Sequence, residues 1–295
     1  MTARRALITG ATGFVGSRLA YRLVHDGWDV TIVVRPGSDR LLVKDFVGRL
    51  TVYEHDGTTV SMTSLVRQTG PEVVFHLASL FLSQHRASDI EPLIRSNILF
   101  GTQLLEAMAA ADVRLLVNAG TSWQHYEGRA YSPVNLYAAT KQAFETILQY
   151  YLETSSLRVI TLKLFDTYGP GDPRPKLFHL LRRTAESRQP LAMSPGEQLI
   201  DLVHIDDVVN AFVLAAQRLA SLPAGHETYS VSSGAPLRLR DLVALYEQVT
   251  GATLPITWGG RPYRPREVMT PWHDERPLPG WSPKISLEEG IRQLR

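Results

Sequence analysis

The stretch ITGATGFVGS, residues 8–17, determines the fold expected for this chain of 295 residues. It places Gly10, Gly13 and Gly16 directly after the apolar run RALI. Glycine lets the backbone turn tightly and approach a phosphate, and a helix that begins near Phe14 directs free N–H groups at the same point. An ordinary strand-to-helix turn also uses glycine. Because a strand precedes the motif and a helix follows it, we predict a dinucleotide-binding turn.

The rest of the chain alternates between two kinds of segment. Short β-branched runs are separated by longer segments with helical spacing, such as residues 16–27 and 97–112. This alternation is typical of a parallel sheet with helices on both faces. We predict an α/β fold, a doubly wound parallel sheet of the Rossmann type with a smaller C-terminal α/β lobe. The runs are RALIT, DVTIVVR, RLTVYEHD, EVVFHLAS, VRLLVNAGTS and LRVITLKLF.

The regular pattern fades after Phe165, where a Pro- and Gly-rich segment begins. We predict a dinucleotide-binding domain over residues 1–165, joined by a return of the chain at about 202–232. Residues 166–201 and 233–295 are predicted to form the substrate-binding lobe. Ligands of such folds bind outside the carboxyl ends of the strands, so the site is expected between these two parts.

The composition excludes several classes of protein. There is no cysteine, which removes disulfides, thiolate nucleophiles and cysteine-based metal sites, and we predict no metal. The formal net charge is +2 and the basic residues are scattered, so no nucleic-acid partner is expected. No apolar run approaches the ~20 residues of a membrane span. We therefore predict a cytoplasmic protein without a membrane partner.

The end of the second predicted strand indicates which dinucleotide binds. An NAD site usually has an acidic residue there, whereas an NADP site offers a cation to the 2′-phosphate. Here the strand ends in valine, and Arg35 and Ser38 follow. This favours NADP(H), with NAD(H) as the alternative if Arg35 is only a solvated charge. Asp56, before Gly57, is suited to accept from the adenine amino group or to cap a turn.

Residues 135–145, NLYAATKQAFE, carry the expected chemistry. Tyr137 and Lys141 are four residues apart and share one face of a helix. A phenol has a reference pKa of about 10, and a nearby ammonium favours the phenolate. Ser122 ends an apolar strand and is expected to donate to the oxygen of a carbonyl that is being reduced. We predict Ser122, Tyr137 and Lys141 as the catalytic residues.

These motifs resemble the extended short-chain dehydrogenase/reductases, in the NAD-dependent epimerase/dehydratase group that acts on nucleotide sugars. The resemblance also includes VVFHLAS, NILFGT, YGPGDPRPK, HIDDVV and YRPREV. It implies a Ser/Thr–Tyr–Lys triad and a nucleotide held by the C-terminal lobe. The predicted cofactor contacts are Gly10, Thr12, Gly13, Phe14, Val15, Gly16, Arg35, Ser38, Asp56, Gly57, Leu77, Ala78, Asn97, Tyr137 and Lys141. The predicted substrate contacts are Ser79, Trp123, Gln124, Tyr168, Lys176 and Arg264.

Some of these positions allow simpler interpretations. Asn97 is equally suited to stabilise a helix kink, His76 to packing within a strand, and the acidic residues of HIDDVV to a helix N-terminus. The sequence also departs from the family at one point, because Ile200 precedes Asp201 where the family often has Arg. We therefore expect one phosphate contact to be missing or moved.

The reaction type follows from differences within the family. Sugar 4,6-dehydratases have an Asp–Glu pair after the triad Ser/Thr, because elimination needs an acid and a base. Trp123 and Gln124 stand there in this chain, which argues against dehydration. Arg35 argues against the tightly held NAD+ of a 4-epimerase. We predict NADPH-dependent reduction of a 4-keto group on a nucleotide-activated deoxysugar, with Tyr137 as proton donor.

Three other functions are consistent with the same motifs. They are an NAD-dependent nucleotide-sugar epimerase, a reductase of a ketone without a nucleotide, and a regulatory relative that binds the dinucleotide without turnover. Within the family, the residues most resemble reductases of a CDP-linked 4-keto dideoxy sugar, so we expect a CDP- or dTDP-linked substrate. The resemblance also implies a homodimer formed through the helices that bear Asn97 and Tyr137.

Overall fold

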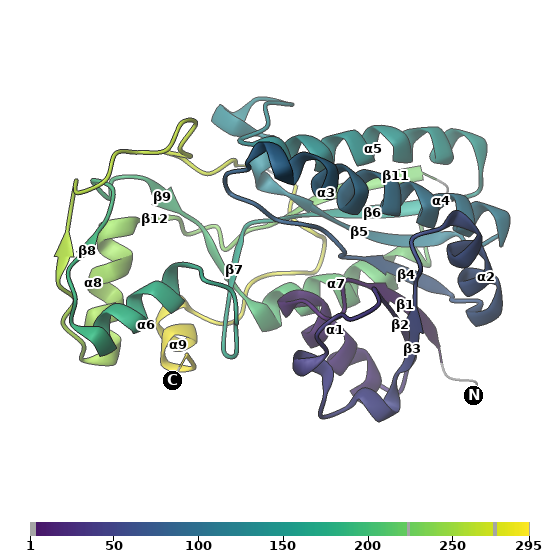
Figure 1. Ribbon diagram of the computed structural model, residues 1–295, viewed down its shortest axis with the longest axis horizontal. Coiled ribbons are helices and arrows are strands. Elements are labelled where there is room, and N and C mark those ends of the chain that lie inside the picture. The colour runs from purple at the N-terminus through teal and green to yellow at the C-terminus, as the bar shows by residue number, and fades with distance from the viewer. Residues whose placement is uncertain (1–3, 223–224, 274–275, 295) are drawn as a thin grey trace.

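The computed structural model describes residues 4–222, 225–273 and 276–294, and a parallel sheet forms the centre of this part of the chain (Figure 1). The strand order reverses between β1 and β4, and in such sheets the ligand-binding crevice lies at this reversal. Along the sheet the strands are β11 (Gly225–Val231), β6 (Arg158–Leu164), β5 (Leu115–Thr121), β4 (Val73–His76), β1 (Arg5–Thr9), β2 (Asp29–Val34) and β3 (Thr51–Glu54).

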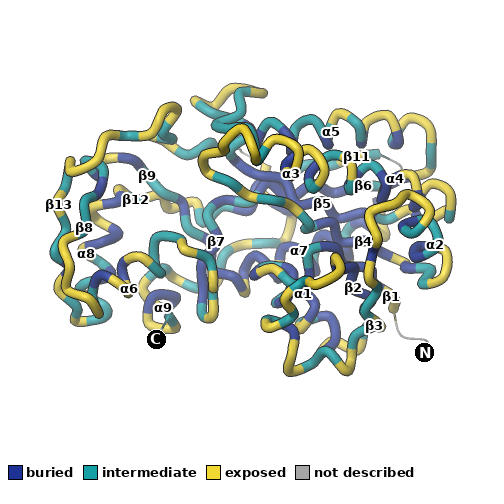
Figure 2. Tube along the Cα trace, in the orientation of Figure 1, coloured by how far each residue is buried: buried dark blue, intermediate teal, exposed yellow. Residues whose placement is uncertain are grey.

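Helices cover both faces of the sheet, as the alternation of segments predicted. In β1, Ala6 and Ile8 pack into one apolar cluster, whereas Leu7 packs into the other, because successive strand residues point to opposite faces. Figure 2 shows the strands as the buried centre between these layers. On one face lie α1 (Phe14–His25) and α7 (Ile205–Leu219), and on the other lie α2 (Thr59–Thr69), α4 (Phe100–Ala110) and α5 (Leu136–Thr154).

A short helix and a π-helical turn lead into α4. They are α3 (Ile90–Ile94) and the turn Arg95–Leu99. The doubly wound parallel sheet confirms the predicted fold class. In the part of the chain that the structure describes, no helix is both long enough and apolar enough to cross a membrane.

The C-terminal lobe has its own apolar cluster, which contains Leu181, Leu242 and Ile291. Its helices are α6 (Leu177–Ser187), α8 (Leu239–Thr250) and α9 (Leu287–Arg292). Its two-residue strands pair as β9 (Leu199–Ile200) with β12 (Leu237–Arg238) and β8 (Leu191–Ala192) with β13 (Ile256–Thr257). Figure 1 shows this lobe beside the sheet, with the C-terminus in it.

The segment 202–232, predicted to return to the main sheet, has two parts. Helix α7 packs on the sheet and β11 pairs with β6, so these elements join the main sheet and its helices. Strand β10 (Leu202–His204) instead pairs with β7 (Asp166–Tyr168) in a separate two-stranded sheet between the two parts. The predicted domain boundaries themselves stay a prediction.

Candidate active site

The loop between β1 and α1 is a tight turn that requires two of its glycines. Gly10 has a φ of 75°, and a Cβ there would lie 2.6 Å from the backbone nitrogen of Ala78. A Cβ on Gly16 would lie 2.2 Å from the carbonyl oxygen of Gly10. Among the residues that the structure describes, no side chain caps the N-terminus of α1. The first N–H groups of α1 are therefore available to an anion, which suits the pyrophosphate of a dinucleotide.

A cavity of about 230 Å³ opens beside this turn, and we call it the glycine-loop cavity. The loop, the segment after β4, the end of β5 and helix α5 contribute its walls. It gathers the three predicted catalytic residues, Ser122, Tyr137 and Lys141, in one place. The other predicted cofactor contacts that line it are Gly10, Gly13, Phe14, Val15, Gly16 and Leu77.

Helix α5 presents Tyr137 and Lys141 to this cavity. Asn135 caps the helix, because its side-chain oxygen accepts from the Ala138 N–H at 3.0 Å. The Asn135 amide also donates to the carbonyl oxygens of Leu82 and Ser83, at 3.1 Å each. The cap therefore fixes both the start of the helix and the segment after β4 that faces it.

Burial shifts the pKa values of both Tyr137 and Lys141. Burial raises the pKa of Tyr137 to about 12, although Ser79, Thr121 and the charge of Arg174 act in the opposite direction. Burial also lowers the pKa of Lys141 to about 8. Desolvation therefore dominates at Tyr137 in the protein by itself, and the effect of Lys141 on a Tyr137 phenolate stays a prediction. Tyr137 stays a neutral phenol near neutral pH, which is the form that donates a proton.

Ser122 follows directly after β5, as predicted, and lines the cavity. The turn that holds it depends on Gln124, whose side-chain oxygen accepts from the Thr121 N–H at 3.1 Å. The Gln124 amide nitrogen donates to Gln142 at 2.8 Å, and the residue is fully buried. We therefore remove Gln124 from the predicted substrate contacts, because both ends of its amide already have partners within the protein.

Asn97 connects the segment after β4 to helix α5. Its buried side chain accepts from the Leu80 N–H at 2.7 Å and donates to the Thr140 hydroxyl at 2.9 Å. It also accepts from the hydroxyl of Ser79, which lines the glycine-loop cavity. The side chain thus stabilises the π-helical turn and positions Ser79, while a direct contact of Asn97 with a cofactor stays a prediction.

Two further residues with simpler interpretations have structural partners. His76 is buried in β4, shares a hydrogen bond of 2.8 Å with Thr9, and has its pKa lowered to about 3 by burial. Asp207, in the motif HIDDVV, accepts from the backbone N–H groups of Lys284 and Ile285. His76 therefore packs within the sheet, and Asp207 anchors the C-terminal segment to α7.

The predicted contacts for the adenosine half lie at the ends of β2 and β3, outside the glycine-loop cavity. Arg35 is exposed, and its guanidinium has no partner among the described residues. The Ser38 hydroxyl accepts from the Arg35 N–H at 3.1 Å. Asp56 accepts from the N–H and the hydroxyl of Thr58, so it caps a turn before α2 and Gly57 follows it with a φ of 92°. The role of Thr12 and Ala78 toward a cofactor likewise stays a prediction.

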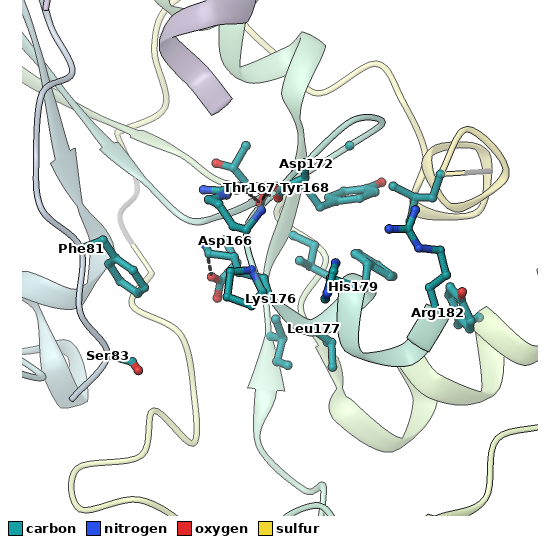
Figure 3. A pocket seen from close by; sticks show the side chains of 18 of the residues that line it. Phe81, Ser83, Asp166, Thr167, Tyr168, Asp172, Lys176, Leu177, His179 and Arg182 are labelled. Carbon is teal, nitrogen blue, oxygen red and sulfur yellow. Dashed lines mark hydrogen bonds and ion pairs between the residues drawn. The ribbon is translucent and has the colours of Figure 1, made fainter. Parts of the chain in front are cut away.

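Two larger cavities adjoin the first. The lobe cavity, about 480 Å³, contains Tyr168, Lys176 and Arg264. Figure 3 shows Lys176 between Phe81 and Ser83 on one side and His179 and Arg182 on the other. The central cavity, about 810 Å³, lies next to Ser122 and is walled by Trp123, Trp272 and Arg264 among others. Four of the predicted substrate contacts, Trp123, Tyr168, Lys176 and Arg264, therefore line these two cavities.

The structure also identifies residues that the sequence did not indicate. The ring of Phe81 meets Tyr137 edge to face at 5.0 Å and lies 5.6 Å from the ring of Trp123. Arg174 lies over the ring of Phe14 at 4.7 Å. Both residues lie in loops that have no periodic pattern, so their neighbours in the folded chain are the main evidence for their place in the site. The motif YGPGDPRPK was the one available signal for Arg174.

Comparison with known proteins assigns the family. Residues 6–232 match the NAD dependent epimerase/dehydratase family. The match includes the glycine turn, the end of β5 and the Tyr137–Lys141 face of α5, all of which meet at the glycine-loop cavity. The chain belongs to this family of nucleotide-sugar-modifying enzymes. The resemblance inferred from the sequence is thus confirmed.

Individual relatives differ in activity. CDP-abequose synthase of Salmonella muenchen is 24% identical over 99% of this chain and 97% of that protein. UDP-glucose 4-epimerase of Mycolicibacterium smegmatis is 29% identical over 97% of this chain and 96% of that protein. The solved structure of MoeE5 with UDP-glucuronic acid and NAD is 26% identical, covers 98% of this chain and 97% of that one, and has a TM-score of 0.82.

Proposed function

We propose that this protein reduces a 4-keto group on a nucleotide-activated deoxysugar, with NADPH as the hydride donor. The observation that carries the proposal is the meeting of Ser122, Tyr137 and Lys141 in a cavity that starts at the glycine turn and adjoins two larger cavities. Similarity to CDP-abequose synthase supports a reductase and a CDP-linked sugar.

The dinucleotide fits the residues that are present. The close approach of Gly10 to Ala78 and the uncapped start of α1 suit a pyrophosphate. When bound, the reduced cofactor supplies a hydride to the carbonyl carbon. Ser122 donates a hydrogen bond to the carbonyl oxygen, and Tyr137 transfers its proton to that oxygen as negative charge develops there. The resulting phenolate is stabilised by the Lys141 ammonium and regains a proton from solvent.

The preference for NADPH rests on Arg35. The guanidinium is exposed at the end of β2 and lacks a partner among the described residues, whereas nearby Arg40 pairs with Glu54. A free guanidinium suits the 2′-phosphate of NADPH. The presence of NAD in the MoeE5 structure supports NAD(H) as the alternative cofactor.

The substrate is proposed from the two larger cavities. Lys176 and Arg264 line the lobe cavity, and we propose that they bind the diphosphate of a CDP- or dTDP-linked sugar. Arg264 is held by Glu267 through contacts of 2.7 and 3.0 Å, so its guanidinium is fixed at this wall. Trp123, at the position where dehydratases carry an acidic residue, cannot exchange a proton, which supports reduction over dehydration.

An NAD-dependent nucleotide-sugar 4-epimerase is the second candidate. The observation that favours it is the 29% identity to UDP-glucose 4-epimerase of Mycolicibacterium smegmatis. An epimerase must retain its cofactor, because the same hydride returns to the other face of the sugar. Tyr137 would then act first as a base toward the sugar hydroxyl and afterwards as an acid toward the returning alkoxide.

Cofactor extraction followed by an activity assay tests the proposal. We expect purified protein to oxidise added NADPH, followed by absorbance at 340 nm, when a CDP- or dTDP-linked 4-keto-6-deoxysugar is present. Arg35→Asp should shift cofactor selectivity toward NADH by about 1.5–3 kcal/mol, the value of a charge-assisted hydrogen bond. If the purified protein holds NAD+ firmly and NMR shows that it epimerises UDP-glucose, the proposed reductase is wrong and the protein is an epimerase.

We also propose a homodimer formed through the helices on the α5 face. Large apolar side chains are exposed there, with exposures of 45% for Ile90, 41% for Ile94, 44% for Leu99 and 62% for Tyr150. We infer that the same helices of a second copy cover these side chains, as the family resemblance implies. Light scattering on the purified chain should give twice the mass of 32.9 kDa, and Leu99→Glu should reduce that mass to one chain.

A further inference from the structure

The glycine-loop, lobe and central cavities meet at one place, which we call the cavity junction. Among the described residues, Trp123 and Asp166 are the two that line all three cavities. The backbone of Asp166 is fixed there, because β7 pairs with β10 and the Asp166 N–H donates to the carbonyl oxygen of Asp201 at 3.2 Å. An indole and a carboxylate therefore lie where the cavities connect.

The proposed reaction brings the sugar ring to the cavity junction. Ser122 lines the glycine-loop and central cavities, so a carbonyl that accepts from it lies where these two meet. Lys176 and Arg264, which we propose to bind the diphosphate, line the lobe cavity. The sugar links the carbonyl to the diphosphate, and it therefore lies against Trp123 and Asp166.

The carboxylate of Asp166 shares its cations with the proposed diphosphate. Lys176 Nζ lies 3.5 Å from Oδ1 (Figure 3), and the charge of Asp166 also acts on Arg264. Oδ2 has no partner among the described residues, and 41% of the side chain is exposed. A diphosphate that binds Lys176 and Arg264 engages both of these cations. A hydroxyl of the sugar can then supply the hydrogen bond that the carboxylate lacks.

We propose that Asp166 determines which sugars the site accepts. A neutral sugar offers hydroxyl groups, and a carboxylate is a strong acceptor for such a donor. A uronic acid brings a second carboxylate to the cavity junction, where the two like charges repel and Trp123 offers no cation to offset them. The site thus selects neutral sugar nucleotides and rejects uronic acids. This inference rests on the proposed function, since that function places the sugar between Ser122 and the diphosphate.

Calorimetric titration with two sugar nucleotides that share one nucleoside diphosphate tests this selectivity without turnover. They are UDP-glucose and UDP-glucuronic acid, the second of which is bound in the MoeE5 structure. The same pair with CDP or dTDP replaces them if the protein binds only that nucleoside diphosphate. For the parent protein we expect the glucose compound to bind about 10- to 100-fold more tightly than the glucuronic acid compound.

Asp166→Asn should reduce this ratio to about three or less, because the neutral amide no longer repels the sugar carboxylate. The variant should bind the glucuronic acid compound more tightly than the parent protein does, and a damaged site would not produce such a gain. If Asp166→Asn does not fold, Asp166→Ser removes the same charge and must give the same fall in the ratio.

Asp172→Asn is the matched control. It also removes a negative charge from the lobe cavity, but Asp172 is absent from the lining of the other two cavities. It should leave the ratio at the parental value. A parental ratio near one, an unchanged ratio in the Asp166 variant, or an equal fall in the Asp172 variant would each overturn the proposal. If the parent protein binds no nucleoside diphosphate at all, the proposed function is itself wrong, and the selectivity with it.

Discussion

Two buried lysines lie beside helix α5, and their surroundings differ. Lys163, on β6, has 2% of its surface exposed, and its ammonium donates to both carboxylate oxygens of Glu145, at 2.8 and 2.7 Å. Lys141 has 3% exposed, lines the glycine-loop cavity, and has no hydrogen-bond or ion-pair partner among the described residues. Equal burial thus accompanies two roles: the first lysine is neutralised inside the protein, and the second keeps its charge available to a ligand.

The comparison also explains the pKa of Lys141. Its own burial and the charge of Lys163 lower that pKa, whereas Glu145, one turn further along α5, raises it. Because Lys163 and Glu145 carry opposite charges, their effects on the pKa of Lys141 oppose one another. The ion pair therefore leaves burial as the main influence on Lys141, and the ammonium remains the major form at pH 7.

The largest effect is expected for Tyr137→Phe. This change removes the proposed proton donor from the glycine-loop cavity and keeps the aromatic ring against Phe81. We expect kcat to fall about 10²- to 10⁴-fold, the usual contribution of a general acid, with little change in NADPH affinity. Steady-state kinetics with a 4-keto sugar nucleotide measure both. Near-parental turnover would mean that another group supplies the proton, and Tyr126, in the central cavity, is then the next candidate.

Lys163→Met tests the ion pair between Lys163 and Glu145. It leaves the Glu145 carboxylate buried without its cation, and breaking a buried ion pair in this way usually costs about 3–5 kcal/mol. We expect the free energy of unfolding at pH 7, from urea denaturation, to fall by that amount. Glu145→Gln combined with Lys163→Met is the control, because it removes both charges and should recover most of the loss. If Lys163→Met alone leaves the free energy of unfolding unchanged, Lys163 is not a structural cation and does not differ from Lys141 in this way.

Ser122→Ala tests whether the Ser122 hydroxyl acts on the substrate in the glycine-loop cavity. The residue is expected to polarise the carbonyl, and removal of one such donor typically costs about 10²- to 10³-fold in kcat. Thr121→Ser is the matched control, because Thr121 Oγ1 accepts from the Trp123 N–H and a serine keeps this bond. Equal losses in the two variants would assign Ser122 to the support of the turn.

The glycine turn, the strands and the Tyr137–Lys141 face could be predicted because each depends on local spacing within one strand or helix. The sequence could not indicate the pairing of Lys163 with Glu145, which lie on different elements and meet only after folding. For the same reason it assigned Gln124 to the substrate, although that amide is occupied by Thr121 and Gln142. The raised pKa of Tyr137 could not be predicted either, since desolvation depends on the surrounding protein.

The smallest effect is expected for Lys141→Met, and it is an increase in the free energy of unfolding. A lysine whose folded pKa is lowered to about 8, from 10.5, binds fewer protons in the folded state than in the unfolded state between these two pH values. Stability therefore rises with pH across this window, and below it the buried charge lowers stability. Replacing Lys141 by Met should thus raise the free energy of unfolding at pH 7 by about 1–3 kcal/mol.

The same Lys141→Met variant should lose activity and NADPH affinity, because the ammonium no longer stabilises the phenolate or contacts the ligand. Urea denaturation at pH 7 and at pH 10.5 measures the stability of both proteins. The gain should shrink at the higher pH, where the parental lysine is itself neutral. A variant that is less stable than the parent at pH 7 would show that Lys141 is a structural cation like Lys163, and the difference between the two regions would then disappear.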